Sequence, residues 1–265
     1  MIRTHCAPIA MIFLLAAVMV SSAHGWAAGP GASPPAKPAA GAVSASPDDD
    51  SDDTPALIVT ADFNRDGIAD IAEVAWPEGN STGPRYLTLF LGQKDGTFKE
   101  ADSSPVLGHD PQSIVVDDLN GDGIPDVIVG DADGTLLELL GDGKGNLIPA
   151  GSIGHIGSVA SIAVGDFNRD GILDLAVSDP HANAVTVFLG TGNGSFRAAW
   201  TFALPRPGTV FQLVAADFNG DGIPDLAVTN EDQDTFEVMI GNGNGTFTYE
   251  PKLSHLADPN AHCVT

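Results

Sequence analysis

The stretch ADFNRDGIAD (residues 61–70) places three carboxylates and one amide side chain within nine residues. Carboxylates at this spacing repel one another unless a cation lies among them. Ca²⁺ takes six to eight oxygen ligands in flexible geometry, and a glycine in the middle allows the chain to turn tightly around the ion. The spacing therefore predicts a calcium loop. Its ligands would be the side chains of Asp62, Asn64, Asp66 and Asp70 and the backbone carbonyl of Ile68.

The pattern occurs four times, and the leading aspartates are 56, 48 and 51 residues apart. Such recurrence indicates a repeat architecture. It predicts up to four calcium ions. The other three ligand sets would be Asp118, Asn120, Asp122, Ile124 and Asp126; Asp166, Asn168, Asp170, Ile172 and Asp174; and Asp217, Asn219, Asp221, Ile223 and Asp225.

Three other interpretations of the acidic pattern fit it less well. Asx residues bond their own backbone in ordinary turns, but we expect a mere turn to have no use for the distant last Asp that every copy keeps. An EF-hand needs a Glu at the twelfth position and flanking helices; Glu73 fits by position, but Val129, Val177 and Val228 do not. Mg²⁺ demands stricter geometry, and Zn²⁺ prefers His or Cys, which the loops lack.

Short apolar runs flank each acidic pattern, as in ALIVT (56–60) and IAEVAW (71–76). Runs of four to six residues rich in Val, Ile and Leu, bounded by Gly, Asn, Asp and Pro, are typical of strands rather than helices. A second motif, such as VFLGTGNGSF (187–196), follows in every repeat; with strands on both sides it predicts a hairpin turn, not a phosphate-binding loop. Four strands per repeat predict an all-β fold, a β-propeller of about four four-stranded blades.

The paired motifs D-x-N-x-D-G-x-x-D and L-G-x-G-x-G-x-F resemble the FG-GAP/VCBS repeats of bacterial surface proteins and of integrin α-chain propellers. The resemblance covers residues 55 to about 250, and it implies that the acidic loop of each blade holds calcium. Such propellers usually have seven blades, whereas this chain has four recognisable repeats. The alternatives are a small four-bladed ring, an open fragment, or a part of a larger assembly.

The termini differ in composition from the repeats. Residues 1–27 are typical of a cleaved signal peptide for secretion, with an uncleaved membrane anchor as the alternative. Residues 28–54, rich in Pro, Ala and Asp, predict a disordered linker. The repeats then occupy 55–251, followed by a C-terminal tail at 252–265. Only Cys263 would remain after cleavage, so no internal disulfide is expected.

The chain carries 35 acidic and 11 basic residues, which disfavours nucleic acid as a partner. No membrane insertion is expected after signal cleavage. The histidines do not recur in register with the repeats, so we expect no catalytic site.

The favoured function is a secreted, calcium-rigidified binding or adhesion module. It would take a protein or glycan ligand, with self-association to complete the propeller as a further expectation. The alternatives are a carbohydrate-active enzyme on a propeller scaffold, with Arg85, Tyr86, Arg197, Arg206 and Tyr249 as candidates, and a structural fragment of a larger adhesin.

Overall fold

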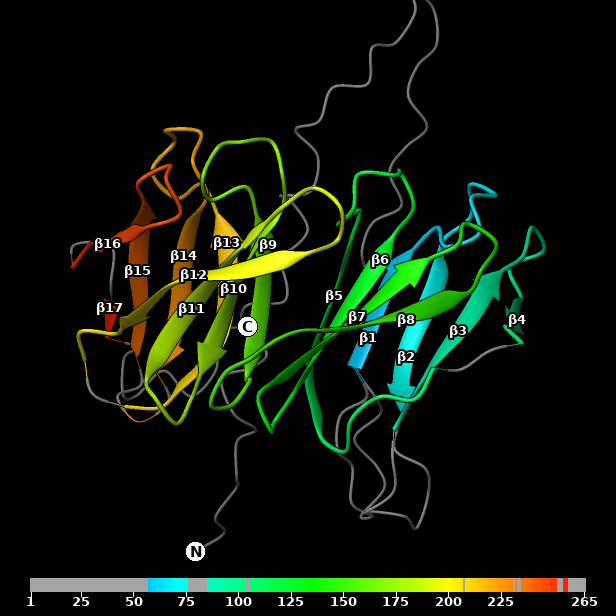
Figure 1. The fold of residues 1–265 in the computed structure, drawn as a ribbon, viewed down its shortest axis with the longest axis horizontal. Helices are drawn as coiled ribbons and strands as arrows, with labels where there is room; N and C mark the ends of the chain where they lie inside the picture. Colours follow the sequence, from blue (N-terminus) through cyan, green and yellow to red (C-terminus); the bar gives the residue numbers. More distant parts are fainter. Residues whose placement is uncertain are drawn as a thin grey trace, which may run out of the picture.

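The fold is all β and consists of four antiparallel sheets (Figure 1). It is taken from a computed structural model that describes residues 57–75, 85–102, 105–206, 208–230, 232, 235–251 and 255–256. The predicted signal peptide and linker lie outside these residues, as does the tail apart from its two residues at 255 and 256. Within the described part, no helix has the length and apolar character needed to cross a membrane.

Each repeat forms one sheet, in which consecutive strands pair with their sequence neighbours. We call these sheets blades 1 to 4. Blade 1 contains β1 (Leu57–Ala61), β2 (Asp70–Ala75), β3 (Tyr86–Gly92) and β4 (Phe98–Glu100). Blade 2 contains β5 (Pro111–Asp117), β6 (Asp126–Asp131), β7 (Thr135–Gly141) and β8 (Leu147–His155). Blade 3 contains β9 (Ser161–Gly165), β10 (Asp174–Asp179), β11 (Ala184–Gly190) and β12 (Phe196–Ala203). Blade 4 contains β13 (Val210–Ala216), β14 (Asp225–Asn230), β15 (Thr235–Gly241) and β16 (Phe247–Tyr249), and β17 (His255–Leu256) pairs with β15.

The predicted blade architecture is confirmed. In blades 2 and 3 the second strand is the most deeply buried, because it lies between two partners within its sheet and between two neighbouring sheets. All six residues of β6 and of β10 are buried. The alternation of side chains across a strand then sends one set of residues toward the preceding blade and the other toward the following blade.

The blades stack in chain order around their first strands. β1 contacts β5, β5 contacts β9, and β9 contacts β13. In Figure 1 these inner strands run across the view in the order β13, β9, β5, β1, so blades 1 and 4 occupy opposite ends of an arc. Three apolar clusters fill the junctions between blades 1 and 2, 2 and 3, and 3 and 4. Among the described residues no such cluster joins blade 4 to blade 1.

Candidate functional site

The four acidic loops connect the first and second strands of each blade and lie at the same end of the molecule as the Gly-rich turns (Figure 1). In blade 1, the Asp62 carboxylate accepts hydrogen bonds from the backbone N–H groups of Asp66 (3.0 Å) and Gly67 (2.9 Å). Asp66 in turn accepts one from the N–H of Ile68 at 2.9 Å. The same bonds recur in the other three loops. The hydrogen bonds of an ordinary Asx turn are thus present in every loop.

The fourth position of the loop alternates between two residue types along the chain. Arg65 and Arg169 occupy it in blades 1 and 3, both with φ of 61°, and Gly121 and Gly220 occupy it in blades 2 and 4, both with φ of 79°. A positive φ is strained for a residue with a side chain and costs glycine little. The two arginines are therefore held in an unfavourable backbone conformation that glycine adopts freely.

The last Asp of each loop has a different environment from the first three ligand positions. Asp70, Asp126, Asp174 and Asp225 are fully buried, at 0% exposure. In blade 3, one Asp174 oxygen accepts a hydrogen bond from Phe167 N–H (3.0 Å) and the other from Gly190 N–H (2.9 Å). The other blades repeat both bonds. The expectation that a turn has no use for this carboxylate is wrong, because the carboxylate fastens the loop to the Gly-rich turn.

The second motif does more than form the predicted hairpin turn, because its first glycine is the partner of that carboxylate. A Cβ on Gly190 would collide with the carbonyl oxygen of Leu173, and the glycine at the same position of each other blade meets the equivalent carbonyl. Only glycine lets this backbone approach closely enough to donate its N–H to the buried Asp. The motif is a hairpin turn, as predicted, but it also docks onto the acidic loop. The signal was available in the sequence, because the two motifs occur together in all four repeats.

The carboxylates of one loop act on one another electrostatically. Burial raises the pKa of Asp126 to about 6, and the charges of Asp122 and Asp118 add to the increase, against hydrogen bonds from Gly141 and Leu119 that lower it. Asp174 behaves in the same way, with a pKa raised to about 6. Within the described residues, no Lys, Arg or His forms an ion pair with a loop carboxylate. The loop carboxylates thus accept hydrogen bonds from backbone N–H groups and from the side-chain amide of the loop Asn, all of them uncharged donors.

This donor set has the chemistry that calcium requires. Each loop supplies three carboxylates, one amide oxygen and backbone carbonyls, all hard oxygen ligands, and no sulfur or imidazole. A carboxylate oxygen that accepts one N–H keeps a second lone pair. In the described part of the chain, however, no group of three Asp, Glu, His or Cys side chains is arranged around a single metal position. The residues fit the ion by type and charge, and their assignment as ligands stays a prediction.

The loop end of the molecule is not the same at every junction. Arg65 of blade 1 extends over blade 2, where Cβ atoms on Gly143 and Gly123 would lie 3.2 Å from its Cδ and 3.8 Å from a guanidinium nitrogen. Gly145 N–H of blade 2 donates to Phe63 O of blade 1 at 3.2 Å. The junction between blades 3 and 4 repeats both features. There Arg169 lies against Gly243, and Gly245 N–H donates to Phe167 O at 2.9 Å.

A cavity of about 970 Å³ opens among the acidic loops of blades 2, 3 and 4. Its lining includes Asp118, Asp166, Asp217 and Arg169 together with several loop glycines. It lies where blade 2 has Gly121 at the position of the arginines. Its walls are the acidic loops already described, so it is part of the same candidate site.

The residues considered for catalysis do not converge. Tyr86, Arg197 and three histidines, His109, His155 and His181, are exposed and belong to different blades or to the connections between them. Arg85 is buried at 3% exposure, whereas Arg206 and Tyr249 are half-buried in and next to blade 4. The side chain of His255 and all of His262 lie outside the described residues. No nucleophile, base and orienting group come together in the part of the chain that the structure describes.

Repeated blades with a shared acidic loop define a class of β-repeat protein, and comparison with known proteins gives its family. The family described as FG-GAP-like repeat matches residues 62–129, 118–177, 170–228 and 217–265. The chain belongs to this family. It is also similar to integrin alpha-PS5 of Drosophila melanogaster, with 39% identity over 175 residues. That match covers 54% of this chain and 16% of the relative, so the chain spans a small part of the relative's length. The family and this relative identify the chain as an FG-GAP-repeat domain that is similar to part of an integrin α chain.

Proposed function

We propose that this chain is an extracellular binding module whose acidic loops each bind one Ca²⁺. The observation that carries the proposal is the recurrence of three carboxylates per loop, none of which forms an ion pair with a cationic side chain among the described residues. Ca²⁺ would offset this repulsion and hold the first and second strands of the blade together. The ligands would be the alternate loop residues named above. The buried Asp would be the last of them and would keep its hydrogen bond to the Gly-rich turn.

The predicted signal peptide at residues 1–27 and the similarity to an integrin α chain both support an extracellular location. Extracellular calcium modules bind with dissociation constants of about 10⁻⁴–10⁻³ M, so millimolar calcium would fill a large fraction of such sites. At about 100-fold excess over the dissociation constant, each ion adds about 2.7 kcal/mol to the folded state. A protein or glycan partner would contact exposed loops, since loops tolerate variation and carry recognition in rigid scaffolds.

The test is calcium titration by calorimetry together with thermal unfolding in EDTA, Ca²⁺ and Mg²⁺. We expect up to four ions per chain, a melting temperature that falls in EDTA, and recovery with Ca²⁺ but not with Mg²⁺. The double variant D166N/D170N should bind one ion fewer, while the exposed D102N variant should bind the full number. A melting curve that is indifferent to all three conditions would refute the metal sites.

Protons should compete with calcium in two of the loops. The pKa of Asp126 and of Asp174 is about 6 in the absence of the ion, because both carboxyls are buried beside other carboxylates. Binding must therefore displace a proton below about pH 6, and calcium affinity should fall as the pH is lowered through that value. The binding constant measured at pH 7.5 and 5.0 checks this.

A further inference from the structure

The chain contains five Asn-Gly pairs, a dipeptide whose side-chain amide is open to attack by the backbone nitrogen that follows it. Glycine has no side chain to hinder this attack, which closes a succinimide ring within the chain. Two of the pairs, at Asn120 and Asn219, belong to the acidic loops, and the other three, at Asn193, Asn242 and Asn244, belong to the Gly-rich turns. The same dipeptide therefore occurs in two kinds of turn, whose hydrogen bonds can be compared.

In the acidic loops, the attacking nitrogen and the leaving group are both engaged in hydrogen bonds. The N–H of Gly121, which would attack Asn120, donates to Asp118 Oδ1 at 2.9 Å. The amide nitrogen of Asn120, which would leave, donates to Asp122 Oδ2 at 3.0 Å. The loop of Asn219 repeats both bonds, at 2.7 and 2.9 Å. Ring closure would break these bonds, so we expect both asparagines to be stable.

The Gly-rich turn of blade 3 presents Asn193 differently. Gly194 N–H donates no hydrogen bond to any described residue. Asn193 is exposed, and its Oδ1 accepts hydrogen bonds from Thr191 Oγ1 at 2.6 Å and from Ser195 N–H at 3.1 Å. Because a backbone N–H can only donate, the side-chain atom that faces Ser195 is the carbonyl oxygen. The amide nitrogen is then the group without a hydrogen-bond partner.

Two donors on one carbonyl oxygen favour attack at the carbon that carries it. They polarise Cγ of Asn193 and stabilise the negative charge that develops on the oxygen when a nitrogen adds, as the donors of an oxyanion hole do. The Gly194 nitrogen is the next backbone nitrogen along the chain, and solvent reaches the exposed side chain to carry away the departing ammonia. This turn therefore combines an unengaged attacking nitrogen, a polarised carbonyl and an unengaged leaving group.

The other two pairs in Gly-rich turns each lack one of these features. Gly245 N–H, which would attack Asn244, donates to the carbonyl oxygen of Phe167 at 2.9 Å. The amide nitrogen of Asn242, which would leave, donates to Thr246 Oγ1 at 3.0 Å. Of the five pairs, the one in blade 3 alone leaves both the attacking nitrogen and the leaving group without a bond to the described residues.

We propose that Asn193, activated by the hydrogen bonds to its carbonyl oxygen, is a site of spontaneous deamidation that reacts far faster than the other four asparagines. The Gly194 nitrogen bonds to Asn193 Cγ and loses its proton to solvent, and the bond from Cγ to Nδ2 breaks to release ammonia. Water then opens the succinimide at either carbonyl and gives Asp or isoAsp. Each event adds one negative charge to the loop end of blade 3. The proposal goes beyond the calcium-dependent binding function and does not depend on it.

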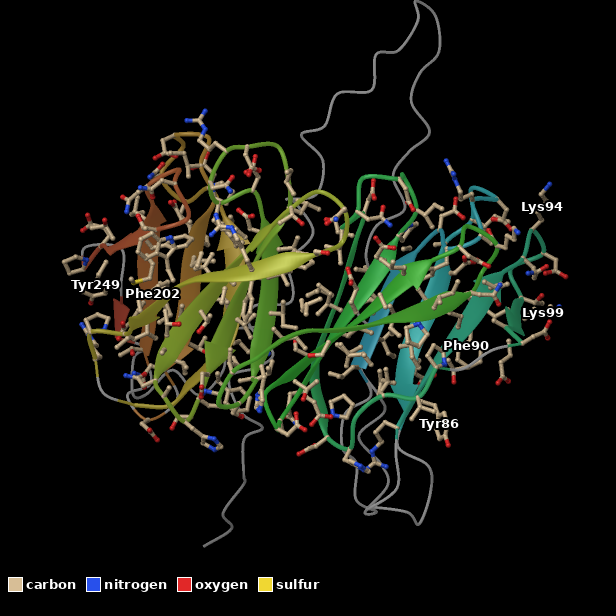
Figure 2. All side chains as sticks on the ribbon, viewed as in Figure 1. Tyr86, Phe90, Lys94, Lys99, Phe202 and Tyr249 are labelled. Atoms are coloured by element: carbon tan, nitrogen blue, oxygen red, sulfur yellow. The ribbon has the colours of Figure 1, made fainter. Side chains whose placement is uncertain are left out.

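The two products should differ in their effect on the junction of blades 2 and 3. Asp has a precedent in blade 1, where Asp95 Oδ1 accepts hydrogen bonds from Thr97 N–H at 3.0 Å and Thr97 Oγ1 at 2.7 Å. Figure 2 shows this turn at Lys94, which points outward. IsoAsp instead routes the backbone through the side-chain carbons and lengthens the turn next to Gly194. A Cβ on Gly194 would already lie 2.9 Å from Glu138 Oε1, so the lengthened turn has no room against blade 2.

The experiment is peptide mapping by mass spectrometry after incubation of the purified chain at pH 8, in EDTA so that calcium in the acidic loops does not affect the rates. We expect Asn193 to deamidate many-fold faster than each of the other four asparagines. The matched control is the same chain unfolded in urea, where all five pairs lose their hydrogen bonds and should react at similar rates. Similar rates for all five pairs in the folded chain, or a faster reaction at any of the other four, would overturn the proposal.

Two variants test the cause of the reactivity. T191V removes the hydroxyl that donates to Asn193 Oδ1 and should slow deamidation there several-fold. T246V makes the same change in the turn of blade 4 and should leave the rate at Asn193 unchanged. Equal effects of the two variants on Asn193 would refute activation by Thr191.

The variant N193D tests the consequence for stability. Freshly purified N193D should unfold in urea like the wild type, whereas incubated wild-type protein enriched in isoAsp should unfold at lower urea concentration. A fresh N193D that is as unstable as the isoAsp form would refute the role of the lengthened backbone. Because calcium titration is a separate readout, either proposal can fail without the other.

Discussion

The junction between blades 2 and 3 and the junction between blades 3 and 4 use the same repeat positions but differ at their loop ends. Between blades 3 and 4, Arg169 lies across the next turn, and Gly245 N–H donates to Phe167 O. Between blades 2 and 3, Gly121 stands in place of the arginine, next to a cavity that the loops of blades 2, 3 and 4 line together with Arg169. The apolar cluster below is present at both junctions. The difference teaches that the apolar clusters hold all the blades together. The arginine contact and the glycine N–H hydrogen bond at the loop end, in contrast, connect blade 1 to blade 2 and blade 3 to blade 4.

A buried charge adds to the difference. Glu138 on β7 faces blade 3 with 6% exposure, and its Oε1 has no hydrogen-bond partner. A Cβ on Gly194 of blade 3 would lie 2.9 Å from that oxygen. The same repeat position holds Leu89, Val187 and Val238 in the other blades. A carboxyl therefore occupies an apolar position at the one junction of the three that also lacks the arginine.

The largest effect is expected at the buried last Asp of the acidic loop, a feature that all four blades share. D126A and D174A each remove a buried carboxylate that accepts two backbone N–H groups. Leaving two buried donors without a partner costs on the order of 3 kcal/mol of unfolding free energy. Urea unfolding in EDTA should show similar losses for both, with exposed D102A near neutral. If D174A lowered the unfolding free energy much more than D126A, the hydrogen bonds of the buried Asp would differ in strength between blades 2 and 3.

The second prediction concerns Glu138. Burial, with a smaller contribution from the Asp126 charge, raises its pKa from 4.5 to about 7. The folded state therefore holds the proton more tightly than the unfolded state, so the carboxyl costs nothing below about pH 4.5 and an increasing amount as the pH rises to about 7. E138L should be stabilising by roughly 2–3 kcal/mol at pH 8 and nearly neutral at pH 4.

Unfolding free energies at the two pH values, in EDTA and in Ca²⁺, check the Glu138 prediction. E138Q is the matched control, because it keeps the shape and removes the charge, and it should follow E138L in its pH dependence. An effect of E138L that is equal at pH 4 and pH 8 would attribute the gain to packing and not to the carboxylate.

The fold was accessible from the sequence because its determinants are local and repeated. Four four-stranded blades were predicted from the length of the apolar runs, from the Gly and Asp residues that bound them, and from two motifs in fixed order. The structure confirms these blades. The loops could be located to the residue for the same reason. Repetition did not determine whether the ring closes, because closure depends on the contacts of blades 1 and 4 and not on the motifs that the four repeats share.

The environment of the last loop Asp was not predictable from its own loop. Asp174 and its equivalents bond to Gly190 and its equivalents, 16 residues further along the chain in blade 3. Spacing within the loop carries no information about such a partner. Glu138 was missed for a similar reason: it is the one charged residue in the apolar strand TLLELLG, and only the neighbouring blade makes its position a buried one.

The third prediction tests the arginine contact directly. R169G removes the side chain that lies over Gly243 and at the same time relieves a positive φ of 61° that costs about 1 kcal/mol. The two effects oppose each other, so global stability should change by less than about 1 kcal/mol. Local opening should change more, and the amide of Gly245 should exchange with solvent several-fold faster. Hydrogen exchange read by NMR checks this, with the Gly145 amide at the junction of blades 1 and 2 as the internal reference. If both amides respond equally, the arginine acts on the whole molecule and not on its own junction.

The smallest effect is expected from installing the arginine at the junction of blades 2 and 3. Gly121 has a φ of 79°, close to the 61° that Arg65 and Arg169 adopt at the same loop position, so G121R has a precedent within the chain. The new side chain would lie toward the Gly-rich turn of blade 3, near Glu138 and Gly194, and its charge would lower the raised pKa of that carboxyl. We expect slower exchange of the Gly194 amide by about two- to three-fold and a gain of about 0.5 kcal/mol in unfolding free energy at pH 8, within the range of a partly exposed ion pair.

In the E138L background this gain in unfolding free energy should disappear. A gain that persists without Glu138 would show that the arginine stabilises the junction by covering the glycine turn, and that the buried carboxyl is not what sets this junction apart.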